Sequence, residues 1–376
     1  MSSTAVRVPF FDAAAQQRSV RAEVLAAVEE VLEGAHFILG PQVGELERAF
    51  AELAGVAHAV GVSSGLDALR LALAALGVQP GDEVILPANT YIATAMAVSA
   101  VGARPVLVDC DPGTYLIDPR QIEPAITPRT RAVIPVHLTG QAADKDAIGE
   151  LARAPGLWVV EDAAQAHGAS FGGRPCGAMG TLGCFSFYPS KNLGACGDAG
   201  MVTTGDRGLA GRLQRLRNYG EDGKYHHVEK GTNARLDTLQ AAVLLVKLRR
   251  LAAWNDARRE HAATYRRLLA GVGDLGFQAA APGSTHGYHL FVVETAQRER
   301  LREHLLAAAV QTGVHYPVPI HLQPAYQDLG HKPGDFPSTE RLASRMLSLP
   351  MYPELRPDQL AYVADQVARF FGGSRP

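Results

Sequence analysis

The chain has 376 residues, of which 47% are hydrophobic and 20% are charged, and its formal net charge is −2. A chain of this length and composition is globular and can form one large and one smaller domain, each with a hydrophobic core. A charge so near neutral gives no generally basic surface, so we expect no nucleic-acid partner and no attachment to an acidic membrane.

Short apolar runs alternate with helical patterns through the first part of the chain. The apolar runs are AHAVGV (57–62), EVILP (83–87), RPVLVD (104–109), RAVIPVHL (131–138) and LWVVED (157–162). Helical patterns such as LDALRLALAAL (66–76) and TYIATAMAVSAV (90–101) separate them. This alternation predicts βαβ units and an α/β fold whose mostly parallel sheet is covered by helices.

The pattern changes after the runs CFSF (184–187) and MVTT (201–204), because long helices begin near residue 236 and shorter mixed elements follow them. We therefore predict a large domain over residues 1–250 and a small C-terminal α+β domain over 251–376, with the N-terminal helix packing near the small domain. Seven Lys or Arg residues between 245 and 269 are interpreted as the solvated face of an amphipathic helix.

Three groups of residues are predicted to lie at the carboxyl ends of strands, where open parallel sheets bind their ligands. The first group is Ser63, Ser64 and Gly65, where a strand runs directly into a helix. The free backbone N–H groups and the positive helix end suit a phosphate. A serine that merely caps the helix is the alternative.

Residues 61–65 also match the G-x-S-x-G nucleophile elbow of serine hydrolases, and the strand-to-helix context agrees with that motif. An elbow serine needs an oxyanion-hole loop on an earlier strand, yet few residues precede it and no HGGG-like run occurs. A hydrolase is therefore the weaker alternative.

The second group is Glu161 and Asp162, which end an apolar strand. A carboxylate in such a place is costly to bury unless it has a cationic partner, so Asp162 is expected to have one. An Asp that caps the next turn is the alternative. Gln165, three residues on, carries an amide that could reach the same ligand, whereas His167 is interpreted as structural.

The third group is Ser186, at the end of a strand, and Lys191, in the glycine-rich loop behind it. A lysine becomes a nucleophile when its surroundings favour the neutral amine. Pyridoxal phosphate needs a lysine for its aldehyde, a carboxylate for its pyridine nitrogen and a site for its phosphate. Lys191, Asp162 and Ser64–Leu66 with Ser186 supply these in turn.

Nine motifs in the same order along nearly the whole chain resemble the DegT/DnrJ/EryC1/StrS family of sugar aminotransferases. They are VPFFD, HFILGPQVGELERAFAEL, GVSSGLDAL, PANTYIATAMAV, EDAAQAHGA, SFYPSKNLGACGDAGM, GTNARLDTLQAAVL, HYPVPIHLQPAY and LSLPMYP. The resemblance implies the type I pyridoxal phosphate (aspartate aminotransferase-like) fold and a homodimer with shared active sites. It also implies transfer of an amino group from L-glutamate to a nucleotide-linked keto sugar.

The resemblance also assigns roles to residues that match the family's motifs. It makes Lys191 the Schiff-base lysine and Asp162 the partner of the pyridine nitrogen. Gln165 matches the residue near the ring hydroxyl, and Tyr91 matches the aromatic residue that stacks on the cofactor ring.

The phosphate-binding residues of the family are matched by Ser186 and by the backbone of Gly65, Leu66 and Asp67. Many members have Thr where this chain has Leu66, so only a backbone contact is implied at that position. Asn233 matches the residue that reaches the phosphate from the other subunit.

The substrate is also inferred from resemblance. Tyr316 and His321, in HYPVPIH, match contacts to the sugar nucleotide. The sequence KNLGACGDAG after the lysine looks like that of C-3 aminotransferases, which favours a dTDP-linked 3-keto-6-deoxyhexose. A UDP-linked 3-keto uronic acid and a 4-keto-6-deoxyhexose are the alternatives. Relatives that dehydrate their substrates have a histidine in place of the lysine, so Lys191 favours transamination.

The four cysteines are scattered, lack metal-ligand spacing and are too few for a disulfide scaffold, so no metal is expected. The N-terminus does not have the pattern of a signal peptide, and no apolar run reaches membrane-spanning length. We therefore expect a cytoplasmic protein that does not associate with membranes.

Overall fold

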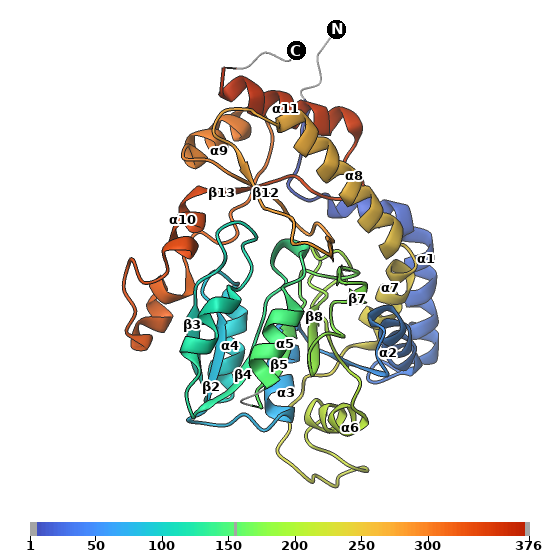
Figure 1. Cartoon of the computed structure of the whole chain (residues 1–376). Coiled ribbons are helices and arrows are strands. Elements are labelled where there is room, and N and C mark those ends of the chain that lie inside the picture. The colour runs from blue at the N-terminus through green and yellow to red at the C-terminus, as the bar shows by residue number, and fades with distance from the viewer. Residues whose placement is uncertain (1–5, 154–155, 373–376) are drawn as a thin grey trace.

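A seven-stranded sheet forms the centre of the computed structural model, which describes residues 6–153 and 156–372. Its strand order is β1-β9-β8-β5-β4-β2-β3, and Figure 1 shows it in the lower half of the molecule. The strands are β1 (His58–Val62), β2 (Glu83–Pro87), β3 (Arg104–Val108), β4 (Thr130–Val133), β5 (Trp158–Asp162), β8 (Leu182–Ser186) and β9 (Gly200–Thr204). β9 runs antiparallel to β1 and β8, whereas the other neighbouring pairs are parallel. The sheet is therefore mixed and mostly parallel, as predicted.

Helices cover both faces of this sheet (Figure 1). One face packs against α3 (Gly65–Ala75), α4 (Ile92–Ala100) and α6 (Arg207–Leu216), and the other against α2 (Pro41–Ala54), α5 (Lys145–Arg153) and α7 (Thr238–Leu248). Along β2 the faces alternate, since Val84 and Leu86 join the core of α3 and α4 while Ile85 packs with Ile148 of α5. Burial on both faces explains why these strands read as continuous apolar runs.

A second sheet, of three antiparallel strands, lies above the first in Figure 1. It consists of β10 (Gly276–Phe277), β12 (Phe291–Glu294) and β13 (Met346–Leu349), and it shares a core with α8 (Leu251–Leu269), α9 (Arg298–Ala307) and α11 (Pro357–Phe370). Short strands β6 (Ser170–Phe171), β7 (Arg174–Pro175) and β11 (Ser284–Thr285) form a third sheet.

The C-terminal part of the chain also contacts the core of the first sheet. Ile320, Tyr326, Leu329 and Phe336, which precede α10 (Pro337–Arg345), pack into that core. The division near residue 250 therefore stays a proposal. α1 (Ala13–Gly34) packs through Val20 on α7 and α8, and the preceding segment pairs through Val8 with Val310 near the second sheet.

The connection between β8 and β9 positions the lysine loop. Because these antiparallel neighbours are joined by residues 187–199, Lys191 lies beside the carboxyl ends of β8 and β5. The Ala195 N–H donates to the carbonyl of Phe187 at 2.8 Å, and the Nζ of buried Lys247 on α7 donates to the carbonyl of Gly194 at 2.7 Å. These bonds fix the loop at the edge of the sheet where ligands bind.

Candidate active site

Asp162 is a buried carboxylate at the carboxyl end of β5. Its Oδ2 accepts a hydrogen bond from Thr94 Oγ1 at 2.8 Å, and its Oδ1 accepts one from the Ala164 N–H at 3.2 Å. It forms no ion pair within the described part of the chain. Burial raises the pKa of Asp162, although the bonds from Thr94 and Ala164 oppose the shift. A buried carboxylate in this state favours a cationic ligand group beside it.

Lys191 is half-buried in the loop after β8, and no side chain in the described residues bonds its Nζ. Burial lowers the pKa of Lys191 to about 8, against the opposing attraction of Asp162. The neighbouring Asn192 is fully buried and donates from Nδ2 to Asn255 Oδ1 at 2.9 Å and to the Gly287 carbonyl at 2.7 Å. The loop is therefore anchored while the amine stays free and partly neutral, as a nucleophile requires.

The start of α3 (Gly65–Ala75) is the helix N-terminus at which a phosphate is predicted to bind. Ser64 is the N-cap of the helix and accepts a hydrogen bond from the Asp67 N–H at 3.1 Å. A Cβ added at Gly65 would lie 2.6 Å from the Cβ of Ser186, so only glycine lets Ser186 approach the helix start. Backbone N–H groups at a helix N-terminus and a nearby hydroxyl suit a phosphate. The side chain of Leu66 is 38% exposed and has no hydrogen-bonding group to offer.

Gln165, Tyr316 and Tyr91 form one wall of the site. The Nε2 of Gln165 donates to Tyr316 Oη at 3.1 Å, and the Tyr316 ring centroid lies 5.1 Å from that of Tyr91. Tyr91 is 54% exposed, so its ring is available to a ligand.

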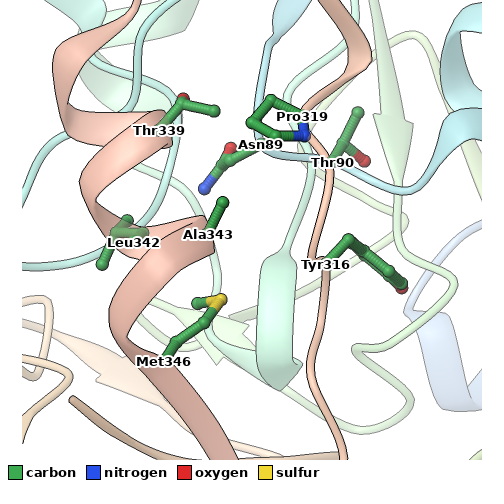
Figure 2. A pocket seen from close by; sticks show the side chains of 8 residues that line it. All are labelled: Asn89, Thr90, Tyr316, Pro319, Thr339, Leu342, Ala343 and Met346. Atoms are coloured by element: carbon green, nitrogen blue, oxygen red, sulfur yellow. The ribbon is translucent and has the colours of Figure 1, made fainter. Parts of the chain in front are cut away.

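Behind Tyr316 lies a small recess of about 10 Å³, which Figure 2 shows between α10 and the segment that carries Tyr316. Its lining residues are Asn89, Thr90, Tyr316, Pro319, Thr339, Leu342, Ala343 and Met346. A cavity of this size holds about one water molecule.

Two predicted site residues lie apart from this cluster. His321 is fully buried, with its Nε2 3.0 Å from Glu340 Oε1 and its ring 4.7 Å from that of Phe336. Its predicted substrate contact stays a prediction. Asn233 is exposed on the surface, and its side chain has no hydrogen bond within the described residues.

Three features of the site were not predicted from the sequence. Thr94 bonds Asp162 from a position in α4 that reads as ordinary helix. His315 lies near Lys191, with its Nδ1 2.8 Å from Ser348 Oγ, and burial and the lysine lower its pKa to about 4. In the sequence, His315 is marked as a candidate site residue only by its position next to Tyr316.

The third feature is the set of hydrogen bonds that the side chain of Glu161 makes. Its fully buried carboxylate accepts hydrogen bonds at 2.7 Å from the N–H groups of Gly177, Met179 and Gly180, and His137 Nε2 lies at 2.8 Å. The backbone N–H of His137 donates to the backbone carbonyl of Asp162 at 3.0 Å. The acidic pair at the end of β5 thus has one carboxylate that holds the backbone and one that faces the site.

The residues present fit pyridoxal phosphate. Among the described residues, Asp162 forms no ion pair and no side chain bonds Lys191 Nζ, and at the start of α3 only a glycine at position 65 leaves room for the side chain of Ser186. The hydrolase alternative finds no such support, because Ser63 Oγ donates to Asp67 Oδ2 at 2.5 Å and bonds no histidine in the described residues. The same residues contain no group of His, Cys, Asp or Glu side chains that could hold a metal ion. No described helix is long and apolar enough to cross a membrane.

The model of the DegT/DnrJ/EryC1/StrS aminotransferase family matches residues 18–368. The chain belongs to this family. A dTDP-3-amino-3,4,6-trideoxy-alpha-D-glucose transaminase from Streptomyces venezuelae is 51% identical over 361 residues, covering 96% of this chain and 95% of the relative.

Two solved structures are also close. DesV from S. venezuelae, in complex with a ketimine intermediate, matches with a TM-score of 0.96 at 50% identity, covering 98% of this chain and 100% of that chain. NtdA from Bacillus subtilis, with bound cofactor PMP, matches with a TM-score of 0.91 at 31% identity, covering 99% and 87%. The chain is therefore a pyridoxal phosphate-dependent sugar aminotransferase with the predicted type I fold.

Proposed function

We propose that the protein transfers an amino group from L-glutamate to C-3 of a dTDP-linked 3-keto-6-deoxyhexose. The observation that supports the chemistry is the arrangement of Lys191 and Asp162, an amine with a lowered pKa near a buried carboxylate that forms no ion pair within the described residues. The support for the sugar is the 51% identity to a transaminase named for a 3-amino dTDP sugar.

Each residue of the cluster has one task in this proposal. When bound, pyridoxal phosphate supplies an aldehyde and an electron-accepting ring. Lys191 would hold the cofactor through its Nζ, and the same amine, when free, would move the proton at Cα of the amino donor. Asp162 keeps a proton on the ring nitrogen, and Thr94 holds Asp162 in place.

The remaining residues bind and orient the cofactor. Ser186 and the backbone N–H groups of Gly65 and Leu66 bind the phosphate. Tyr91 would stack on the ring, and the amide of Gln165 would lie near the ring hydroxyl. Tyr316 and His321 are assigned to the sugar nucleotide, His321 through its support of the segment that carries Tyr316.

The experiment that tests the substrate uses the enzyme in its pyridoxamine form. It is incubated with a panel of nucleotide keto sugars, and the aminated product is detected by mass and located by NMR. The proposal expects the dTDP-linked 3-keto-6-deoxyhexose to react fastest. Preferred amination of a 4-keto-6-deoxyhexose or of a UDP-linked 3-keto uronic acid would overturn the sugar assignment and leave the aminotransferase assignment intact.

The proposal includes a homodimer whose two active sites are shared. Exposed Phe37, Ile38 and Leu39 form an apolar group with exposed fractions of 45%, 50% and 38%. Ile38 pairs with Asp237, so this group lies next to the segment that carries Asn233. A second copy seated on these residues would bury them and place Asn233 near the partner's cofactor phosphate. We also place the protein in the cytoplasm, because its four cysteines are free thiols.

A further inference from the structure

Thr139 has an unusual backbone conformation, and it lies beside the wall of the site that Gln165, Tyr316 and Tyr91 form. Its φ is 65° and its ψ is −5°, and the residue is fully buried in a short turn (Leu138–Gly140). A β-branched residue in the left-handed region is strained, and such strain persists only where the surroundings impose it. Here the surroundings are the segment before β12, because the N–H groups of Leu290 and Gly287 donate to the carbonyls of Thr139 and Gly140 at 3.1 and 2.8 Å.

The strained turn aims the Thr139 N–H at the side chain of Gln165. The distance from the Thr139 backbone nitrogen to Gln165 Oε1 is 2.6 Å. A backbone N–H can only donate, so the oxygen of this amide must face Thr139. The other end of the amide is then an NH₂ group, which also can only donate, and it points to Tyr316 Oη at 3.1 Å. Hydrogen-bond logic alone thus fixes the orientation of Gln165.

The consequence concerns the proton of Tyr316. Burial raises the pKa of Tyr316, and the Asp162 charge adds to the shift, so the hydroxyl stays protonated at neutral pH. Because Oη accepts from Gln165, its own proton is left for another partner. Tyr316 Oη has no second hydrogen bond in the described part of the chain, and its ring lies against Tyr91 on the ligand side.

We propose that Thr139 and Gln165 are positioning residues that make the Tyr316 hydroxyl a hydrogen-bond donor to an acceptor oxygen of the bound ligand. Together the three residues form a polarity relay, from the Thr139 N–H through Gln165 to Tyr316 Oη. The inference rests on the proposed function for the identity of the ligand. The acceptor oxygen belongs either to the keto sugar or to a carboxylate of the amino donor, and the relay selects against a ligand that presents only an N–H donor there.

The substitution Gln165→Glu reverses the relay with almost no change of shape. A carboxylate would still accept from the Thr139 N–H, but it would also accept from Tyr316 and draw the hydroxyl proton away from the ligand. Gln165→Met is the matched control, since it removes the amide without adding a charge.

The first measurement needs no turnover. Cofactor-free protein is isotope-labelled at tyrosine Cζ, and the Tyr316 resonance is assigned by its loss in Tyr316→Phe. We expect Gln165→Glu to shift this resonance as for a phenol that donates to a carboxylate, and Gln165→Met not to produce that shift. A Tyr316 resonance at the same position in wild type and Gln165→Glu would overturn the relay, whatever the substrate of the enzyme.

The second measurement is a double-mutant cycle with Gln165→Glu and Tyr316→Phe, in which the glutamate and keto-sugar half-reactions are followed separately by cofactor absorbance. Cofactor affinity and thermal unfolding of each variant are measured as controls. We expect Tyr316→Phe to weaken one ligand about 5- to 10-fold, as for loss of one hydrogen bond. Gln165→Glu should weaken the same ligand, and the double variant should be within about twofold of Tyr316→Phe.

The affected half-reaction identifies the source of the acceptor oxygen. Effects that multiply in the double variant would refute the relay while the aminotransferase assignment stands. A wild-type enzyme that reacts with neither glutamate nor any keto sugar would refute the proposed function instead, and the tyrosine resonance would still decide the relay.

Discussion

The hydroxyl of Thr94 donates a 2.8 Å hydrogen bond to Oδ2 of Asp162 across 68 residues of sequence, and both side chains are buried. Thr94 Oγ1 also lies 2.9 Å from Oγ1 of Thr90, which precedes α4, so the two threonine hydroxyls form a chain that ends on the carboxylate. Burial raises the pKa of Asp162, and this hydrogen bond opposes the shift. The pair therefore keeps a negative charge available where the ring nitrogen of the cofactor is expected.

Asp162→Asn tests the charge itself. The substitution keeps the shape of the side chain, so the fold and cofactor binding should survive, but the ring nitrogen loses its counter-charge. We expect transamination to slow by about 100-fold or more, the size typical for removal of a preorganised electrostatic contact. Single-turnover absorbance measurements with glutamate provide the rate, and circular dichroism provides the fold control. Near-normal turnover in a folded variant would refute the assigned role.

Thr94→Val tests whether the hydroxyl supports the carboxylate. Valine has the shape of threonine without the donor, so we expect a loss of about 5- to 10-fold in the rate, much smaller than for Asp162→Asn. Thr94→Ser, which keeps the hydroxyl, should retain most of the rate. If the Val and Ser variants were equally slow, packing rather than the hydrogen bond would be the cause.

The positions of Asp162, Ser186 and Lys191 could be predicted because each follows from local sequence. An apolar run that stops at a polar residue marks the end of a strand, and strands β5 and β8 do end at Asp162 and Ser186. Thr94 and His137 could not be found in this way, since their roles depend on contacts to β5 made by distant segments. The backbone conformation of Thr139 could not be predicted for another reason. Contacts with residues 287–290 impose it, and the residues next to Thr139 in the sequence do not indicate it.

Lys191 should capture the cofactor at a lower pH than an ordinary lysine. Its pKa is lowered from 10.5 to about 8, so the neutral amine, which is the nucleophile, accumulates as the pH rises through 8. We expect the rate of pyridoxal phosphate capture by the cofactor-free enzyme to rise with a midpoint near pH 8. Stopped-flow absorbance measures this rate, and N-acetyl-lysine in free solution is the reference.

Borohydride reduction identifies the residue responsible for that capture. The label should appear on the peptide that contains Lys191, and Lys191→Ala should bind the cofactor without becoming labelled. A label on another lysine, or a capture midpoint near 10.5, would contradict this assignment.

Glu161 should contribute to stability in a manner that depends on pH. Burial opposes ionisation, but the bonds from His137 and from the backbone N–H groups of Gly177 and Gly180 outweigh it and hold the pKa of Glu161 below its usual 4.5. A depressed folded-state pKa stabilises the fold above pH 4.5, and this contribution is lost as the pH falls through the folded value. Glu161→Gln breaks a buried charged network and should cost about 3 kcal/mol at neutral pH.

Thermal unfolding between pH 3 and 7 measures this contribution. The difference between wild type and Glu161→Gln should narrow below pH 4.5, as the wild-type carboxyl takes up a proton. Glu52→Gln, at an exposed position on α2, is the matched control and should change stability little. A constant difference across the whole pH range would show that Glu161 is not the charged centre of this network.

Mixing two inactive variants tests whether the active sites are shared. The side chain of the exposed Asn233 has no hydrogen bond within the described part of its own chain, and the residue lies near the apolar group of Phe37, Ile38 and Leu39. Asn233→Asp should repel the cofactor phosphate and impair the enzyme severely. If Asn233 serves the partner's site, a heterodimer of this variant with Lys191→Ala keeps one site in which both groups are intact. Random re-association makes about half of the dimers heterodimers, each with one working site of two, so we expect about a quarter of the wild-type activity. If Asn233 served its own chain, neither site of the heterodimer would be complete. Heterodimers purified through two different affinity tags would then show no activity above that of the parent variants.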